Sequence, residues 1–178
     1  MKKKKISLKG MIYASMFGAV TAAGAYIIIP LAPIPITLQT LFLCLAAVLL
    51  GAKLGALSQV IYVLLGIIGL PVFAGGKAGI GVLFGPTGGY LIGFIAGAYV
   101  IGKLSQAKKK PGLIWNLFSM VAGLIVIYAF GVIQLSFVAK ISINKSISVG
   151  VLPFLIGDAL KIIVAALITL KIRDKIRI

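Results

Sequence analysis

Asp158 and Lys161 place two opposite charges inside an apolar segment of the chain. This segment, residues 146–172, reads SISVGVLPFLIGDALKIIVAALITLKI, and Asp158 is the only carboxylate before position 174. On a helix, positions three apart lie on the same face, one turn apart. A charge near the centre of a bilayer costs roughly 2.5–3.5 kcal/mol on insertion scales, so such residues face a protein interior or a cavity. We predict that this pair binds a substrate; the alternative, mutual neutralisation alone, is disfavoured because two apolar residues would pack there at lower cost.

A glycine-rich segment is the second candidate for ligand contact. Residues 69–94 read GLPVFAGGKAGIGVLFGPTGGYLIGF, and glycine lets a backbone approach a ligand closely. A phosphate-binding Walker A loop requires G-x-x-x-x-G-K-[ST]. The match around Gly76 and Lys77 lacks the first glycine and the final hydroxyl, and GAYVIGKL at 97–104 ends in leucine. The segment is therefore not a nucleotide site, and we do not expect the chain to hydrolyse ATP.

A third candidate is the proline-rich stretch IIIPLAPIPITLQT, residues 27–40. Proline prevents a continuous helix, and apolar non-helical backbone at membrane depth survives only when it is buried in protein or lines a cavity. We expect the stretch to dip back into the protein, with Thr37, Gln39 and Thr40 placing polar groups near a cavity. An equally good interpretation is that Thr37 caps the next helix.

The composition indicates the elements that must position these residues. The chain is 61% hydrophobic with a mean hydropathy of +1.20, outside the range of soluble domains. Its 178 residues suffice for about six membrane-spanning helices of ~20 residues each, as one domain covering 1–178. With the last span starting near residue 150, Asp158 would lie about 12 Å inside it. The expected spans are residues 8–29, 37–52, 54–70, 84–102, 112–138 and 150–170.

Metal, disulfide and nucleic-acid functions are not expected. The chain has no histidine and a single intramembrane acid, so no zinc or iron site is predicted. The one cysteine, Cys44, lies in an apolar run and is interpreted as a small buried hydrophobe. The net charge of +16 is explained by membrane topology and by contacts with anionic lipids rather than by nucleic acid.

The basic residues are distributed unequally between the two ends of the expected spans. Fourteen lie on the side of the N-terminus, three on the other side, and Lys161 completes the eighteen. This asymmetry predicts that both termini are cytoplasmic. The larger group comprises Lys2 to Lys5, Lys9, Lys53, Lys103, Lys108 to Lys110, Lys171, Arg173, Lys175 and Arg177, and the smaller group comprises Lys77, Lys140 and Lys145.

Small residues recur at every fourth position in several expected helices. Such stripes let helix backbones approach closely, either within one bundle or between partners. Both interpretations remain open at this point. The stripes are Ser15, Ala19 and Ala23; Ala14, Gly18 and Ala22; and Gly89, Gly93 and Gly97 next to Gly88.

The order and spacing of three motifs resemble those of the BioY family, the biotin-binding S subunits of energy-coupling-factor (ECF) transporters. The motifs are PITLQTLF at 35–42, the glycine-rich segment at 69–94, and the D-x-x-K of Asp158 and Lys161. The resemblance covers roughly residues 10–172. It implies an all-α integral membrane protein, a compact bundle of six transmembrane helices with both termini cytoplasmic, in the cell membrane of a prokaryote. It also implies biotin as the ligand, no cofactor, and as partners a transmembrane coupling subunit and two cytoplasmic ATPases.

The resemblance also implies roles for individual residues. Asp158 and Lys161 match the substrate-contacting acid and lysine of the family. The loop with Gly75, Gly76, Lys77 and Tyr90 matches its central glycine block and is assigned to substrate binding, together with Thr37 and Gln39. The stripe of Ser15, Ala19 and Ala23 is similar to the surface that S subunits present to the coupling subunit.

Two other functions remain open. The first is an S subunit for another vitamin, such as thiamine or riboflavin, which the biotin-type glycine block disfavours. The second is a self-sufficient symporter that uses Asp158 as proton carrier, which the short chain and the lack of an inverted-repeat pattern disfavour. An enzyme is not expected because no nucleophile–base pair or metal set is found.

Overall fold

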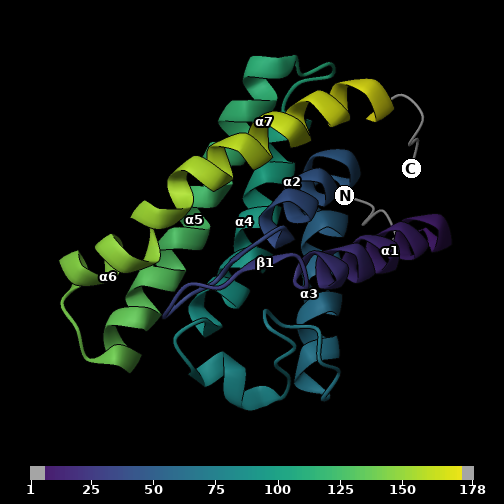
Figure 1. Cartoon of the computed structure of the whole chain (residues 1–178). Coiled ribbons are helices and arrows are strands. Elements are labelled where there is room, and N and C mark those ends of the chain that lie inside the picture. Colours follow the sequence, from purple (N-terminus) through teal and green to yellow (C-terminus); the bar gives the residue numbers. More distant parts are fainter. Residues whose placement is uncertain (1–6, 174–178) are drawn as a thin grey trace, which may run out of the picture.

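The computed structural model describes residues 7–173 and is built mainly from α-helices, with one small β-hairpin (Figure 1). Seven α-helices and two short 3₁₀ segments alternate with loops. The elements in chain order are α1 (Leu8–Gly24), β1 (Ile28–Ile29), β2 (Ile36–Thr37), α2 (Gln39–Leu50), α3 (Ala52–Ile67), η1 (Ile80–Phe84), α4 (Gly88–Gln106), α5 (Leu113–Ala139), α6 (Ile143–Gly150), η2 (Leu152–Phe154) and α7 (Leu155–Ile172).

Helices α4 and α5 form an antiparallel pair whose close approach depends on glycine. A Cβ atom on Gly93 would lie 2.9 Å from the Cα of Ile127, and one on Gly97 would lie 2.9 Å from the carbonyl oxygen of Gly123. Both distances are too short for a real side chain, so these positions bring the two backbones together. The glycine stripe of α4 is therefore used for packing inside the bundle.

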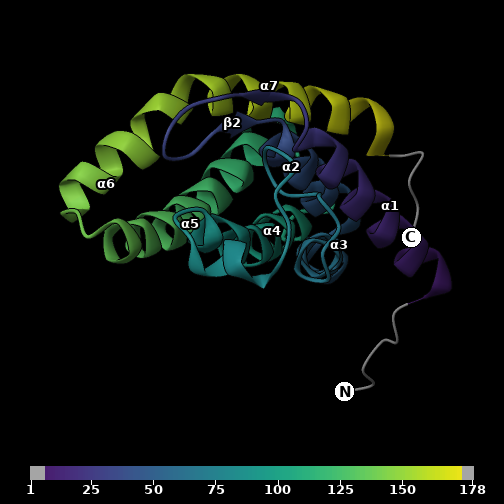
Figure 2. The same ribbon diagram turned by 60° about the horizontal axis from the view of Figure 1, so that its bottom comes forward.

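The N-terminal half of the bundle is packed in the same way. A Cβ on Gly18 of α1 would lie 2.9 Å from the carbonyl oxygen of Ser58 on α3. Helices α2 and α3 are joined by Gly51 alone, whose φ of +80° suits glycine. Helix α7 packs on α2 and α5, and in Figure 2 it forms a layer above α5 and α4, with the hairpin strand β2 on the side toward α7.

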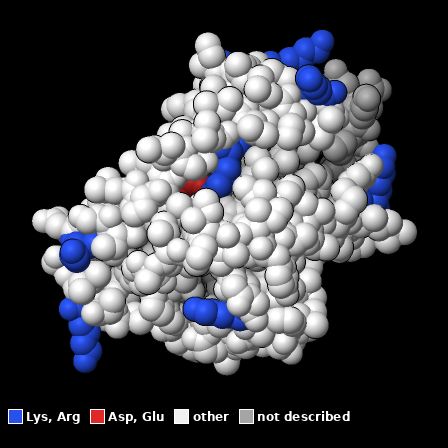
Figure 3. All heavy atoms as spheres, viewed as in Figure 1, with Lys and Arg blue, Asp and Glu red and all other residues white. Residues whose placement is uncertain are grey.

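Among residues 7–173, three helical segments are long and apolar enough to cross a membrane, which indicates a membrane protein. They are Gly88–Gln106, Leu113–Ala139 and the stretch Ile143–Ile172, which contains α6, η2 and α7, whereas α2 and α3 are apolar but shorter. Figure 3 shows most basic side chains near the edges of this face, at the upper right and lower left, with one more at the lower middle and a largely uncharged surface between them. Near the centre of this face one acidic patch adjoins a basic one.

Several helices begin or end at other residues than the predicted spans, and two of these differences have a clear cause. The first helix ends at Gly24 instead of residue 29, because the chain turns and Ile28–Ile29 pairs antiparallel with Ile36–Thr37. The prolines between the two strands prevent the helix from continuing. The last predicted span, residues 150–170, begins after the helical structure of this region has started, because residues 143–150 already form α6. Pro153 in η2 then separates α6 from α7.

Candidate functional site

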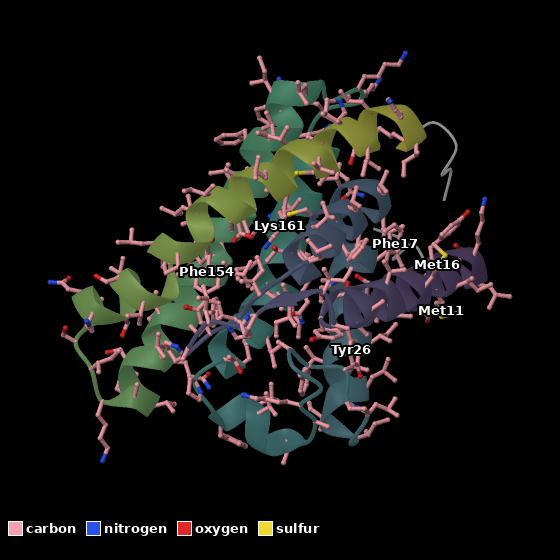
Figure 4. The ribbon with its side chains drawn as sticks, in the orientation of Figure 1. Met11, Met16, Phe17, Tyr26, Phe154 and Lys161 are labelled. Atoms are coloured by element: carbon pink, nitrogen blue, oxygen red, sulfur yellow. The ribbon has the colours of Figure 1, made fainter. Side chains whose placement is uncertain are left out.

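The first two turns of α7 carry the buried ion pair, with Asp158 in the first turn and Lys161 in the second. The Nζ of Lys161 lies 2.8 Å from Oδ1 of Asp158, and the two residues are only 9% and 4% exposed. Asp158 lies close to the start of α7, where the partial positive charge of the helix N-terminus stabilises a carboxylate. Figure 4 shows Phe154 at the end of η2 and Lys161 further along α7, both over the middle of the bundle.

Two hydroxyl groups from other helices complete the surroundings of the carboxylate. Thr40 of α2 donates to Oδ1 of Asp158 at 2.9 Å and accepts from Lys161 at 3.1 Å. Tyr128 of α5 donates its hydroxyl hydrogen to the other oxygen, Oδ2. The pair is therefore held by α2, α5 and α7 together, and Asp158 accepts three hydrogen bonds.

Thr37 and Gln39 form a second polar group at the start of α2. The Thr37 hydroxyl donates to Oε1 of Gln39 at 2.7 Å and accepts from its backbone N–H at 3.3 Å. Nε2 of Gln39 donates to the hydroxyl of Tyr62 on α3. Thr37 therefore accepts from the first N–H of α2 and lines the cavity described below, but the N-cap position itself is occupied by Leu38.

Gly75 and Gly76 shape the turn that presents Lys77. Their φ angles are +74° and +72°, in the left-handed region, where a residue with a Cβ is strained. The turn is closed by a 3.0 Å hydrogen bond from the N–H of Phe73 to the carbonyl oxygen of Lys77. Added Cβ atoms would meet almost nothing, so these glycines are required by the backbone conformation rather than by close packing.

These groups surround one cavity between the hairpin, the loop of residues 68–87 and helices α2, α4, α5 and α7. Tyr90 of α4 lines it and donates to the carbonyl oxygen of Gly150 at 2.8 Å, which ties α4 to the end of α6. The polar lining of the cavity includes the pair of Asp158 and Lys161, the group of Thr37 and Gln39, and Lys77. The apolar part of its wall includes Ile34, Pro35, Phe73, Phe94, Ile127 and Phe154.

Six of the eight predicted binding residues line this cavity, namely Asp158, Lys161, Lys77, Tyr90, Thr37 and Gln39. Gly75 and Gly76 are not among the lining residues and act through the turn next to it. Tyr128 was missed by sequence reasoning, because a hydroxyl in the middle of a 27-residue apolar helix costs far less than a charge and does not by itself indicate a site. Thr40 was expected near the cavity and is one of its lining residues.

The predicted docking stripe lies on the outer face of α1. Ser15, Ala19 and Ala23 are exposed, whereas Ala14 and Gly18 of the neighbouring stripe are buried. Figure 4 shows Met11 and Met16 on the same helix, and both are almost half exposed. The two stripes are thus separated: one packs within the bundle, and the other is available to lipid or to another protein.

The groups that line the cavity are suited to binding a small organic anion. Lysine ammonium groups can donate to a carboxylate or a carbonyl, and Asp158 can accept from an N–H group. The aromatic and aliphatic wall would bury an apolar ring or chain. Among residues 7–173 no group of three His, Cys, Asp or Glu side chains could hold a metal ion.

A charged cavity between long apolar helices, a hairpin and a glycine-rich loop is typical of a solute-binding membrane protein. The chain belongs to the BioY family, whose model matches residues 1–178. It is 52% identical over 166 residues to the biotin transporter BioY of Thermotoga maritima, covering 93% of this chain and 96% of that protein. It is 40% identical to a probable biotin transporter BioY of Pyrococcus horikoshii, with 94% and 95% of the two chains covered.

A solved structure gives the same result for the fold. It is a crystal structure of the S-component for biotin from an ECF-type ABC transporter, with a TM-score of 0.85 and 30% sequence identity. The similarity covers 94% of this chain and 92% of that one. The mostly helical fold of this chain therefore matches that of an S-component.

Proposed function

We propose that this chain binds biotin and acts as the S component of an ECF-type transporter that takes up biotin. Family membership and the solved S-component support the substrate, and the buried pair of Asp158 and Lys161 in the cavity is the observation that carries the site. The chain itself is a transport protein and not an enzyme, and biotin is bound without a cofactor.

The hydrogen-bond capacity of Asp158 and Lys161 supports biotin as the ligand. A carboxylate has about four acceptor positions, of which Asp158 uses three, and an ammonium has three donors, of which Lys161 uses two. One acceptor and one donor thus remain. The ureido ring of biotin offers N–H donors and a carbonyl acceptor, so it fits the free acceptor of Asp158 and the free donor of Lys161.

The position of Lys77 supports one orientation of biotin in the cavity. It lines the same cavity from the glycine-rich loop and is exposed, whereas Lys161 is buried. A carboxylate remains partly hydrated at an exposed cation, which costs less desolvation than burying it. We therefore place the valerate carboxylate of biotin at Lys77 and its ring system at Asp158.

The first test is biotin binding to the purified chain in detergent, measured by titration calorimetry. We expect binding that excess thiamine or riboflavin does not displace. Displacement by either vitamin, or the absence of biotin binding by folded protein, would contradict the proposed substrate.

Uptake by this chain depends, in our proposal, on a coupling subunit and two cytoplasmic ATPases, with α1 as the docking face. Replacing Ala19 by leucine should spare biotin binding and abolish ATP-driven uptake, because a large side chain holds the helices apart. Replacing the exposed Ile156 of α7 by alanine is the matched control on another lipid-facing surface. Loss of binding in Ala19→Leu would contradict the docking role.

The symporter alternative predicts a different outcome in liposomes that contain this chain alone. Uphill biotin uptake driven by a proton gradient, insensitive to ATP and abolished by an uncoupler, would favour a symporter with Asp158 as proton carrier. Binding without uphill uptake supports a capture subunit.

The proposed topology is one domain with six spans in the cell membrane of a prokaryote and both termini in the cytoplasm. Single cysteines at positions 77, 145 and 108 in a Cys44→Ala background test it with a membrane-impermeant thiol reagent. We expect labelling of positions 77 and 145 in intact cells and protection of position 108. The reverse pattern would invert the proposed orientation.

A further inference from the structure

Asp158 and Tyr128 each line two hollows of the protein. One is the cavity described above, and the other is a groove between α5 and α7. The rest of the groove lining is apolar, with Leu124, Ile125 and Leu155 among its residues. The hydrogen bond between Tyr128 and Asp158 therefore lies in the wall that the cavity and the groove share.

The groove belongs to the outer surface of the two longest apolar segments. Ile125 is 62% exposed and Leu155 46% exposed, so in a membrane this surface faces lipid chains. Lipid chains offer no hydrogen bonds. Without the hydroxyl of Tyr128, Oδ2 of Asp158 would have no partner among the residues that the structure describes, and leaving a charged oxygen unpaired in such surroundings is costly.

The other oxygen of the carboxylate is held from the cavity side. Oδ1 accepts from Thr40 and Lys161, both of which line the cavity but not the groove. The two oxygens are thus fixed from different directions, which prevents rotation of the carboxylate about its Cβ–Cγ bond. The remaining acceptor position is on Oδ2, next to the hydroxyl of Tyr128, which also lines the cavity. A fixed carboxylate offers this position to a ligand without further loss of conformational entropy.

We propose that Tyr128 is a positioning residue of the binding site. Its hydroxyl holds Oδ2 of Asp158 on the groove side, and its ring separates the cavity from the lipid. The effect on biotin affinity rests on the proposed function, whereas the shielding of Asp158 from the membrane does not depend on the identity of the ligand.

The first experiment measures biotin affinity in a double-variant cycle. Tyr128→Phe keeps the ring and removes the hydroxyl, and we expect affinity to fall about tenfold. In an Asp158→Asn background the same change should have little further effect, because no carboxylate remains to be positioned. Losses that multiply in the double variant would overturn the proposal, since they would mean that Tyr128 acts independently of Asp158. Tyr99→Phe, an exposed tyrosine of α4 outside both hollows, should bind like the parent protein.

The second experiment needs no ligand. Dicyclohexylcarbodiimide is a lipid-soluble reagent that modifies carboxyl groups from the bilayer, and mass spectrometry of the protein in lipid nanodiscs locates the product. We expect little modification of Asp158 in the parent protein and several-fold more in Tyr128→Ala. Tyr128→Leu, which fills most of the same volume without a hydroxyl, serves if the alanine variant does not fold. Equal modification in folded parent and variant would overturn the shielding role.

The two experiments separate this inference from the proposed function. If the parent protein binds no biotin, the proposed function fails, but the modification of Asp158 still tests the shielding. If biotin binds and Asp158 is modified equally in parent and variant, only the role of Tyr128 fails.

Discussion

The hydroxyl of Tyr26, just after α1, donates a hydrogen bond to the carbonyl oxygen of Pro71, forty-five positions further along the chain. This bond connects the segment that leads into the hairpin with the start of the glycine-rich loop. Both segments contribute to the cavity, the first through Pro35 and the second through Lys77. The hydrogen bond therefore limits how far the hairpin and the glycine-rich loop, which form two sides of the cavity, can move apart.

Removing this contact should make biotin exchange faster. Tyr26→Phe deletes only the hydroxyl, and because the residue is 57% exposed the bond contributes at most about 1 kcal/mol, or roughly fivefold in a rate. We expect biotin dissociation to accelerate by this factor or less, measured by displacement with excess unlabelled biotin. Tyr99→Phe is the control, and an unchanged dissociation rate in Tyr26→Phe would show that the bond does not restrain the cavity.

Neutralising Asp158 should weaken biotin binding. Asp158→Asn keeps the shape of the side chain but replaces a charged acceptor by a neutral one, and we expect at least a tenfold loss of affinity, about 1.4 kcal/mol. Titration calorimetry measures the effect, with thermal unfolding of the ligand-free variant as the control for folding. Unchanged affinity in a folded variant would remove Asp158 from the site.

Removing Lys161 should lower stability as well as affinity. Breaking a buried ion pair from one side costs about 3–5 kcal/mol because the remaining charge is unpaired. Asp158 keeps its bonds to Thr40 and Tyr128, so we expect the lower end of this range for Lys161→Met. Adding Asp158→Asn to this variant should raise its unfolding temperature again. A further decrease instead would show that the two residues stabilise the fold separately.

Lys77 should discriminate biotin from its neutral esters. Lys77→Met should reduce biotin affinity up to about fivefold, since exposed charge pairs contribute at most about 1 kcal/mol. The affinity for biotin methyl ester should not change, because the ester has no carboxylate charge. Lys145→Met, an exposed lysine of α6 outside the cavity, should leave both affinities unchanged. An equal loss for acid and ester would contradict the proposed orientation of biotin.

Filling the contact between α4 and α5 should destabilise the bundle. Gly93→Leu places side-chain atoms where the backbone of Ile127 already lies, and such overpacking costs about 1–3 kcal/mol. This exceeds the gain of at most about 1 kcal/mol from removing a helical glycine. We expect the unfolding temperature in detergent to fall by several degrees. Gly81→Leu, where an added Cβ meets nothing within 4 Å, should change it little.

The buried pair of Asp158 and Lys161 was predictable from the sequence, because a charge in an apolar segment is costly to expose to lipid however the helices pack. The partners of the pair were not predictable in the same way. Thr40 and Tyr128 reach Asp158 from helices far away in the chain, and only the packing of α2, α5 and α7 brings them together. Hydroxyl groups are common in apolar helices, so neither residue alone indicates a site.

The residues at which the helices begin and end were harder to predict than the presence of the helices. Residues 25–29 are as apolar as the helix before them, so hydropathy extends the first span, whereas the strand pairing that ends it is a tertiary contact. Residues 143–148 lie outside the expected spans, although Ser142 accepts a hydrogen bond from the N–H of Lys145 and starts α6. The sequence alone does not show which stripe of α1 is buried. The contact between α1 and α3 decides this, because α3 packs against Gly18, and this stripe, with Ala14, is buried while Ala19 and Ala23 are exposed.

The charges around the cavity also have an electrical consequence. Lys77 and Lys161 carry two positive charges and Asp158 one negative charge, so the empty cavity carries a net charge of +1. A bound monoanion such as biotin makes the occupied cavity neutral. Moving one elementary charge across the membrane potential corresponds to about 2.3 kcal/mol per 100 mV. Any movement of this cavity through the membrane field is therefore voltage-dependent when the cavity is empty and nearly independent of voltage when biotin is bound.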